Sequence, residues 1–367
     1  MRRSITGRAG VLLALACLAH PARAQERALV QGLLDLEGWS TDSRSALLAR
    51  NAGRPAGLAR LCVWSAVEPV SGLVFYAQGE VEGGSAAEEG IETSVEQAGI
   101  RYTRSRALVI DAGIISPIVG MFASRHLSTR NPLVGEPDAY GVVYPTGLRV
   151  SGKTDLADYR VGVVSLPVSN DRYMPHPSPR PRIAAGGGIT PYTGIRVGVS
   201  GTIGPYLSAS VDPRALAGRR WSSYEQRVAA TDVELSAGYV DLRGELAHAW
   251  HEVPGHARMV HGAAWYGEGT YAMTPRLFSS LRVESNAYPY LKPVGTLWPA
   301  SAVKVADAEF GVGYRLAASQ TLKLTYRRDR WQVAPTARVP LADGHAVAIQ
   351  LSSGFDVLDA IERARTR

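Results

Sequence analysis

The stretch DVELSAGYVDLRGELAHAWH, residues 232–251, contains two segments in which charged and apolar side chains alternate. In the first segment Asp232 and Glu234 alternate with apolar residues. After a predicted tight turn at Val240-Asp241, Arg243 and Glu245 do the same. Alternation of this length predicts β-strands with one charged face and one apolar face, joined here as a hairpin.

The same alternation recurs along the chain from residue 25 to residue 355, and no segment keeps a helical period for more than three turns. We expect about 16 strands, or one per roughly 20 residues, which fits strands of about 10 residues plus their turns. The predicted segments are 29–40, 58–67, 71–82, 92–102, 107–114, 141–152, 157–165, 183–190, 194–201, 205–211, 228–239, 241–251, 262–273, 276–286, 303–316 with 320–330, and 344–355.

Connections of two sizes favour a membrane barrel over a soluble sandwich, which would also alternate. Short turns are expected at 103–106, 190–193, 240–241, 274–275 and 317–319, and long loops near 165–182, 212–223, 252–262 and 289–302. Tyrosines that could form an interfacial girdle adjoin the short turns, at Tyr102, Tyr239, Tyr271 and Tyr314. We therefore predict an all-β fold, a closed antiparallel transmembrane β-barrel with short periplasmic turns and long extracellular loops.

Charged strand residues are predicted to point into a water-filled lumen, because Arg or Lys on the lipid face near the midplane costs about 2–4 kcal/mol. The predicted lumen residues are Asp232, Glu234, Arg243, Glu245, Glu309, Lys323 and Arg327.

The two ends of the chain are expected to lie outside the barrel. Residues 1–24 combine a basic start, an apolar run from Ala9 to Ala19 and a small-residue end at Ala24, which predicts a secretory signal peptide. A lipoprotein signal centred on Cys17 is the alternative. Residues 356–367 form a predicted tail with the spacing of a short helix, so the barrel domain is assigned to 25–355.

Composition excludes several classes of protein. The chain has 40 basic and 33 acidic residues, and four of the arginines belong to the predicted signal peptide, so no nucleic-acid partner is indicated. Cleavage of that peptide leaves Cys62 as the single cysteine, which rules out an intrachain disulfide. We expect Cys62 to be a small lipid-facing or packing residue.

The segment from 114 to 140 lacks regular alternation and lies between two predicted strands. Long structureless connections in compact folds are usually functional. It holds the candidate constriction residues Arg125, His126, Arg130, Asn131, Glu136 and Asp138. Folded into the barrel, the segment would narrow the pore, and its arginines would favour anions. The alternative is an extracellular loop whose arginines are merely solvated.

Two stretches resemble a known family. Ile110-Asp111-Ala112-Gly113-Ile114-Ile115-Ser116-Pro117, with Asn131-Pro132-Leu133-Val134-Gly135-Glu136-Pro137, is similar to the strand and inward-folding loop of bacterial outer-membrane porins, particularly the phosphate-selective porin group. Residues 232–250 resemble a late hairpin of the same group. The resemblance implies a 16-stranded, trimeric barrel in outer-membrane lipid that passes small solutes.

The chain departs from that family in two ways. Such porins usually end on a terminal aromatic residue, whereas here Phe355 is followed by residues 356–367. The lysines expected of a phosphate pathway are missing, since only Lys153, Lys292, Lys304 and Lys323 occur, so phosphate specificity is not carried over.

Other chemistries find weaker support in the sequence. His248, His251, His256 and His261 lie close together, but strand alternation places the first two on opposite faces, so no metal site is predicted. We expect no cofactor and no enzymatic activity. The predicted function is passive diffusion of small hydrophilic solutes or anions through a porin of a Gram-negative-type envelope. The alternatives are a non-conducting structural or adhesive barrel, a barrel-embedded lipid hydrolase, and a secreted soluble sandwich.

Overall fold

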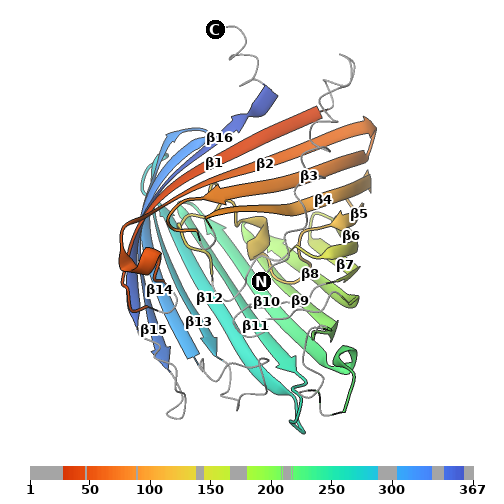
Figure 1. Ribbon diagram of the computed structural model, residues 1–367. Coiled ribbons are helices and arrows are strands. Elements are labelled where there is room, and N and C mark those ends of the chain that lie inside the picture. The colour runs from red at the N-terminus through yellow and green to blue at the C-terminus, as the bar shows by residue number, and fades with distance from the viewer. Residues whose placement is uncertain are drawn as a thin grey trace.

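The sheet closes into a single ring of sixteen antiparallel strands (Figure 1). The computed structural model describes residues 28–45, 48–87, 90–137, 144–165, 180–207, 209, 216, 218–287, 304–332 and 343–358. The strands are β1 (Ala28–Thr41), β2 (Ala56–Val70), β3 (Leu73–Gly83), β4 (Ile91–Ser105), β5 (Leu108–Ile114), β6 (Thr146–Lys153), β7 (Ala157–Val164), β8 (Arg182–Tyr192), β9 (Ile195–Pro205), β10 (Glu225–Ala237), β11 (Val240–His251), β12 (Val260–Ala272), β13 (Leu277–Ala287), β14 (Lys304–Ala317), β15 (Gln320–Gln332) and β16 (Gly344–Asp356).

Each strand pairs with its sequence neighbours, and β1 pairs with β16 to close the ring. That closing register runs from Gln31 opposite Asp356 to Thr41 opposite Ala346. Closure matters because an unpaired edge in hydrocarbon leaves backbone N–H and C=O groups without partners. The predicted fold class is therefore confirmed.

Connections alternate in length around the ring. Short turns of two to four residues occupy 71–72, 106–107, 154–156, 193–194, 238–239, 273–276 and 318–319, and the intervening connections are longer. All short turns therefore lie at one end of the barrel and all longer loops at the other. Exposed tyrosines stand near the short turns, namely Tyr102, Tyr159, Tyr192, Tyr239, Tyr271 and Tyr314.

The two faces of the sheet differ sharply in chemistry. On β13, Leu281 is 50% exposed on the outer face, whereas its neighbour Arg282 is 1% exposed on the inner face. The same alternation runs along β14 and β15, where Phe310 and Leu324 face outward and Glu309 and Lys323 are buried. An apolar outside and a charged inside is the pattern of a barrel that meets lipid.

Several predicted boundaries were wrong. The turn predicted at 240–241 lies at Gly238-Tyr239, where Gly238 adopts a φ of +59° that favours glycine. Of the predicted strand 205–211, Pro205 is the last residue of β9 and Tyr206 lies outside any strand, while residues 208, 210 and 211 lie outside the described residues. Residues 303–316 and 320–330 form two strands, so the predicted number of strands stands.

The predicted ends of the chain are only partly described. Residues 1–24 lie outside the described residues. The strand β16 ends at Asp356, residues 357–358 are helical, and the rest of the predicted tail also lies outside them. Among the helices of the described residues, none is long and apolar enough to cross a membrane.

We expect Leu281→Arg to lower the free energy of unfolding by about 2–4 kcal/mol, because it places a guanidinium on the outer face midway along β13. The measurement is chemical denaturation of the protein folded in lipid vesicles. Leu156→Arg, in a short turn where Leu156 is 67% exposed, is the matched control and should cost about 0–1 kcal/mol. Equal, small effects at both positions would contradict burial of the outer face in hydrocarbon.

Candidate functional site

Residues 115–137, in the connection between β5 and β6, lie inside the barrel (Figure 1). We refer to residues 115–137 as the inner loop. Its hydrogen bonds reach side chains on β1, β4, β6, β7, β9, β11, β12, β13, β14 and β15. A segment can contact so many strands of one ring only from within it.

The first part of the inner loop is fastened to β7 and β9. Arg160 of β7 donates from Nε to the Ile118 carbonyl at 2.6 Å and from Nη2 to the Gly120 carbonyl at 3.1 Å. The N–H of Gly120 in turn donates to the hydroxyl of Ser200 on β9 at 3.1 Å. Strand side chains thus satisfy backbone groups that the loop cannot satisfy internally.

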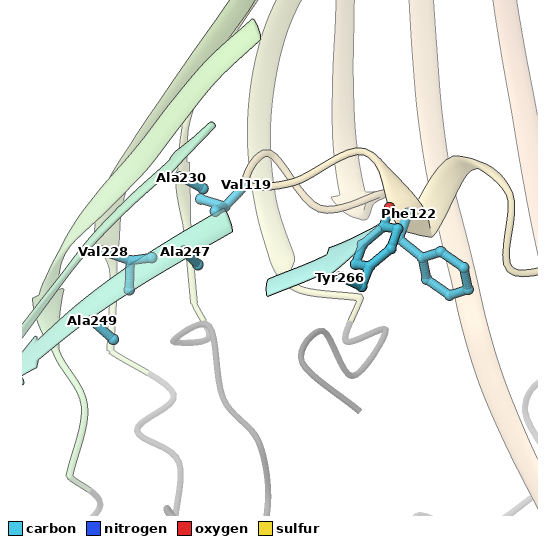
Figure 2. Close-up of a cluster of buried hydrophobic side chains, with 7 residues drawn as sticks. All are labelled: Val119, Phe122, Val228, Ala230, Ala247, Ala249 and Tyr266. Carbon is cyan, nitrogen blue, oxygen red and sulfur yellow. The ribbon is translucent and has the colours of Figure 1, made fainter. Parts of the chain in front are cut away.

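An apolar cluster continues this attachment. Figure 2 shows Val119 beside Ala230 of β10 and Phe122 beside Tyr266 of β12. The rings of Phe122 and Tyr266 meet edge to face, with centroids 6.0 Å apart. Ala230 of β10 and Ala247 of β11 belong to the same cluster. Their small side chains on the inner face leave room for Val119 and Phe122 of the inner loop.

Two adjacent residues of the inner loop reach opposite walls. Arg125 donates to Glu268 at 3.1 Å and to the Tyr266 hydroxyl at 2.8 Å, both on β12. The Nε2 atom of His126 lies 3.8 Å from an oxygen of Glu96 on β4. Because β4 and β12 are eight strands apart in a ring of sixteen, residues 125–126 lie across the middle of the barrel.

The surroundings of His126 set the state of its ring. Nδ1 lies 2.8 Å from the Ala123 carbonyl, and the Tyr144 hydroxyl lies 3.0 Å from Nε2. Burial alone would lower the pKa of His126. The hydrogen bond with Glu96 and the negative charge of Glu136 outweigh burial, so the pKa of His126 is raised from 6.5.

The last part of the inner loop is bound by the amine of Lys323 on β15. Its Nζ donates to the carbonyls of Asn131 and Leu133, at 2.8 and 3.2 Å. The Asn131 side chain in turn donates to the Gly135 carbonyl at 2.8 Å, which holds this turn of the loop together.

Gly135 sits directly on the charged wall. Its N–H donates to Glu309 at 3.0 Å, and its carbonyl accepts from Arg282 at 2.5 Å. A Cβ at this position would lie 2.5 Å from an oxygen of Glu309, so any larger residue would force that carboxylate to shift. Arg282 also bridges Glu268 at 3.2 Å and Glu309 at 2.8 Å, and all three side chains are at most 3% exposed.

The predicted constriction residues differ from one another in burial and in the groups that they contact. Arg125 is engaged with Glu268, and Asn131 is 3% exposed. Arg130 is exposed and donates to the Ser124 carbonyl at 3.2 Å, and Glu136 is also exposed. Asp138 lies outside the described residues. Arg125 therefore does not present an unpaired positive charge, because Glu268 pairs with it.

The seven predicted lumen residues all lie on the inner face of the sheet, opposite the exposed apolar residues. Asp232 pairs with Arg196, and Glu234 lies opposite Arg243 in the register of β10 and β11. Glu245 accepts from the N–H of Met121 in the inner loop, and Glu309 and Lys323 contact that loop as described above. Arg327 bridges Glu284 and Asp307, each at 3.1 Å.

The wall formed by β1 to β4 is different, and we call its carboxylates Asp35, Glu37, Glu80, Glu82 and Glu96 the acidic wall. Arg60 lies among them, 3.0 Å from Glu82, 3.5 Å from Glu80 and 3.9 Å from Glu37. The side chains of Glu80, Glu82 and Glu96 are 16–22% exposed, whereas Asp35 and Glu37 of the same wall are as deeply buried as Glu268 of β12 and Glu309 of β14. Water therefore reaches the acidic wall at Glu80, Glu82 and Glu96.

Sequence reasoning missed several residues of this site. Tyr266, Glu268 and Arg282 hold the centre of the inner loop, yet none was singled out. A signal was present, because Glu268 and Arg282 are charges within alternating segments, as the predicted lumen residues are. Cys62 faces the interior, where the amide of Gln78 lies 3.4 Å from its sulfur, so of the two expected roles it is a packing residue and not a lipid-facing one. His251 is buried and His248 is exposed, as alternation predicted.

We expect Arg282→Ala to lower the free energy of unfolding by about 3–5 kcal/mol, because Glu268 and Glu309 would keep buried charges without their shared cation. Chemical denaturation measures this loss, and limited proteolysis should show faster cleavage within 115–137. Arg227→Ala, which removes an exposed pair with Glu225, serves as control and should cost about 0–1 kcal/mol. A change at Arg282 no larger than the control would contradict its bridging role.

Comparison of the fold with solved structures finds outer-membrane barrels. An anion-selective porin from Comamonas acidovorans superposes with a TM-score of 0.61 at 10% identity, over 89% of this chain and 99% of that one. OmpF of Salmonella typhi in complex with daunomycin gives 0.60 at 10% identity, over 89% and 97%. OmpT, an outer membrane protein of Vibrio cholerae, gives 0.56 at 12% identity in its trimer form, over 89% and 99%.

In sequence, no protein-family model matches the chain, and no curated protein matches it significantly. At 10–12% identity, the structural comparisons support a shared fold but give no evidence of a shared solute. The chain thus has the sixteen-stranded fold of porin-like outer-membrane barrels.

Proposed function

We propose that this protein is an outer-membrane porin that lets small hydrophilic solutes diffuse passively through its barrel. Short turns would face the periplasm and long loops the exterior, as in other barrels of this type. The trimer form among the structural neighbours supports a trimeric assembly in outer-membrane lipid. The proposal includes no enzymatic step and no cofactor.

One observation carries the proposal: Arg125 and His126 contact opposite walls of the ring. A chain segment held across the barrel reduces its open cross-section and would act as the constriction of the pore. Hydrogen bonds from Arg160, Lys323 and Arg282 hold the inner loop, so the constriction would keep its shape while solutes pass.

Charge along the remaining passage supports a preference for cations over anions. The arginines expected to attract anions are partly neutralised, since Arg125 pairs with Glu268. Glu80, Glu82 and Glu96 of the acidic wall are accessible to water, and the carboxylates of this wall outnumber Arg60. Rings or walls of carboxylates favour cations in channels.

The second candidate is a non-conducting structural barrel. The inner loop also favours this candidate, because Arg125 and His126 reach opposite walls and so fill part of the lumen. The two candidates differ in a single measurable property, which is whether ions pass.

We expect the folded protein to give discrete conductance steps in a planar lipid bilayer. Under a salt gradient, the sign of the reversal potential should show cations crossing more readily, because the acidic wall lines the passage. A folded protein that shows no conductance would contradict the porin proposal and favour the non-conducting structural barrel. Conductance with a preference for anions would support the porin proposal but contradict the proposed role of the acidic wall.

We expect Arg130→Glu to shift the reversal potential further towards cations, because its exposed guanidinium lies in the inner loop. Arg276→Glu, in the short turn 273–276, is the matched control and should leave selectivity nearly unchanged. If both variants behave alike, Arg130 does not line the passage.

A further inference from the structure

The inner face of β2, β3 and β4 brings together ligand atoms of different kinds. The sulfur of Cys62 and a carboxylate oxygen from each of Glu80 and Glu96 all lie within 4.8 Å of one another. Cys62 is the single cysteine of the described residues. From these three residues and His126 we propose a binding site for a thiophilic divalent metal ion of the zinc class.

Strand register explains why these residues meet. Cys62 of β2 lies directly opposite Glu80 of β3, so both side chains point to the same face. The register between β3 and β4 shifts after Gln78, so Glu96 is an extra residue in β4. Such a bulge re-aims a side chain, and here it turns Glu96 towards Gln78 and the interior.

His126 provides a fourth ligand from the inner loop. Its Nε2 atom lies 3.8 Å from an oxygen of Glu96. A nitrogen and an oxygen that share a tetrahedral zinc ion, with bonds of about 2.0–2.2 Å, are about 3.3–3.6 Å apart. The pair and the three-residue group therefore need only small side-chain movements to share one ion.

Outer contacts orient these ligands as they do in known metal sites. Nδ1 of His126 donates to the Ala123 carbonyl at 2.8 Å, so the neutral ring would carry its lone pair on Nε2, the atom nearest Glu96. The Tyr144 hydroxyl, now 3.0 Å from Nε2, would yield its place to the ion. Metal-ligating histidines usually donate their other ring N–H to a carbonyl or carboxylate.

Gln78 makes the corresponding contacts on the other side of the group. Its amide nitrogen lies 3.4 Å from the sulfur of Cys62 and also donates to Glu96. An amide donor shared by a thiolate and a carboxylate holds both in place and stabilises their negative charge. The surrounding acidic wall adds an attractive potential for any cation.

The ligand set selects the class of metal. Thiolate and imidazole favour Zn²⁺ and similar transition metals, whereas Ca²⁺ and Mg²⁺ take oxygen ligands. Binding requires the thiol of Cys62, and Nε2 of His126 where it is protonated, to lose a proton to water before the sulfur and the nitrogen form bonds to the metal. Because His126 belongs to the inner loop, the ion would tie that loop to the β2–β4 wall. The site does not depend on whether the barrel conducts.

The test uses the full chain folded in detergent, with Co²⁺ as a spectroscopic probe and Zn²⁺ as competitor. We expect Co²⁺ to produce a thiolate-to-metal charge-transfer band that Zn²⁺ removes, and we expect this band to be absent in Cys62→Ser. Zn²⁺ should also slow alkylation of Cys62 at least tenfold. Absence of both the band and the protection, in protein shown to be folded, would overturn the site.

Variants separate coordination from general electrostatic attraction. Glu96→Gln and His126→Ala should each weaken Zn²⁺ binding at least tenfold, and Gln78→Leu by about 10- to 100-fold. Glu82→Gln removes an equal charge from the same wall but no ligand, so its affinity should stay within about twofold of the parent. If Glu82→Gln weakens binding as much as Glu96→Gln, the ion is attracted only diffusely and the site is wrong.

Discussion

The pairing of β1 with β16 is the interaction on which the rest of the structure depends. It joins the first and last strands of the ring over eleven paired positions and removes the two edges that the sheet would otherwise expose. In hydrocarbon this is a requirement, because unpaired backbone groups there each cost several kcal/mol. Closure also divides every strand into an outer face for apolar residues and an inner face for charges.

The inner face then has to accommodate many ionised side chains in a confined space. It does so by pairing them across strands, as Arg282 does with Glu268 and Glu309. Such buried pairs add little net stability compared with apolar residues, but removal of one partner is costly. Their evident role here is positional, because the same groups also hold the backbone of the inner loop at Gly135.

The attachment of the inner loop makes the interior asymmetric. Its bonds to β7, β9, β11 and β13 to β15 bury the charges of that wall. The wall of β1 to β4 is contacted at fewer points, chiefly through Asp35, Gln97 and Glu96, and its carboxylates Glu80, Glu82 and Glu96 stay more exposed. The proposed passage and the proposed metal site both follow from this asymmetry, and they can be tested independently.

Local sequence by itself determined the fold class, because alternation is a local property that each strand shows without its neighbours. Residues 232–251 were enough to assign one face to charge, and their inward placement agrees. The boundaries were less certain, because the turn predicted at 240–241 lies two residues earlier, where Gly238 adopts a positive φ.

Only the tertiary structure decided which charged side chains are paired with a partner and which remain free to interact with a solute. Arg125 looked like a free cation in the sequence, but its partners Tyr266 and Glu268 lie more than 140 positions away. Cys62, Glu80, Glu96 and His126 likewise come together through strand register, one bulge and the path of the loop. These are long-range relations, and no local pattern encodes them, because each depends on which strands the closed ring places side by side or face to face.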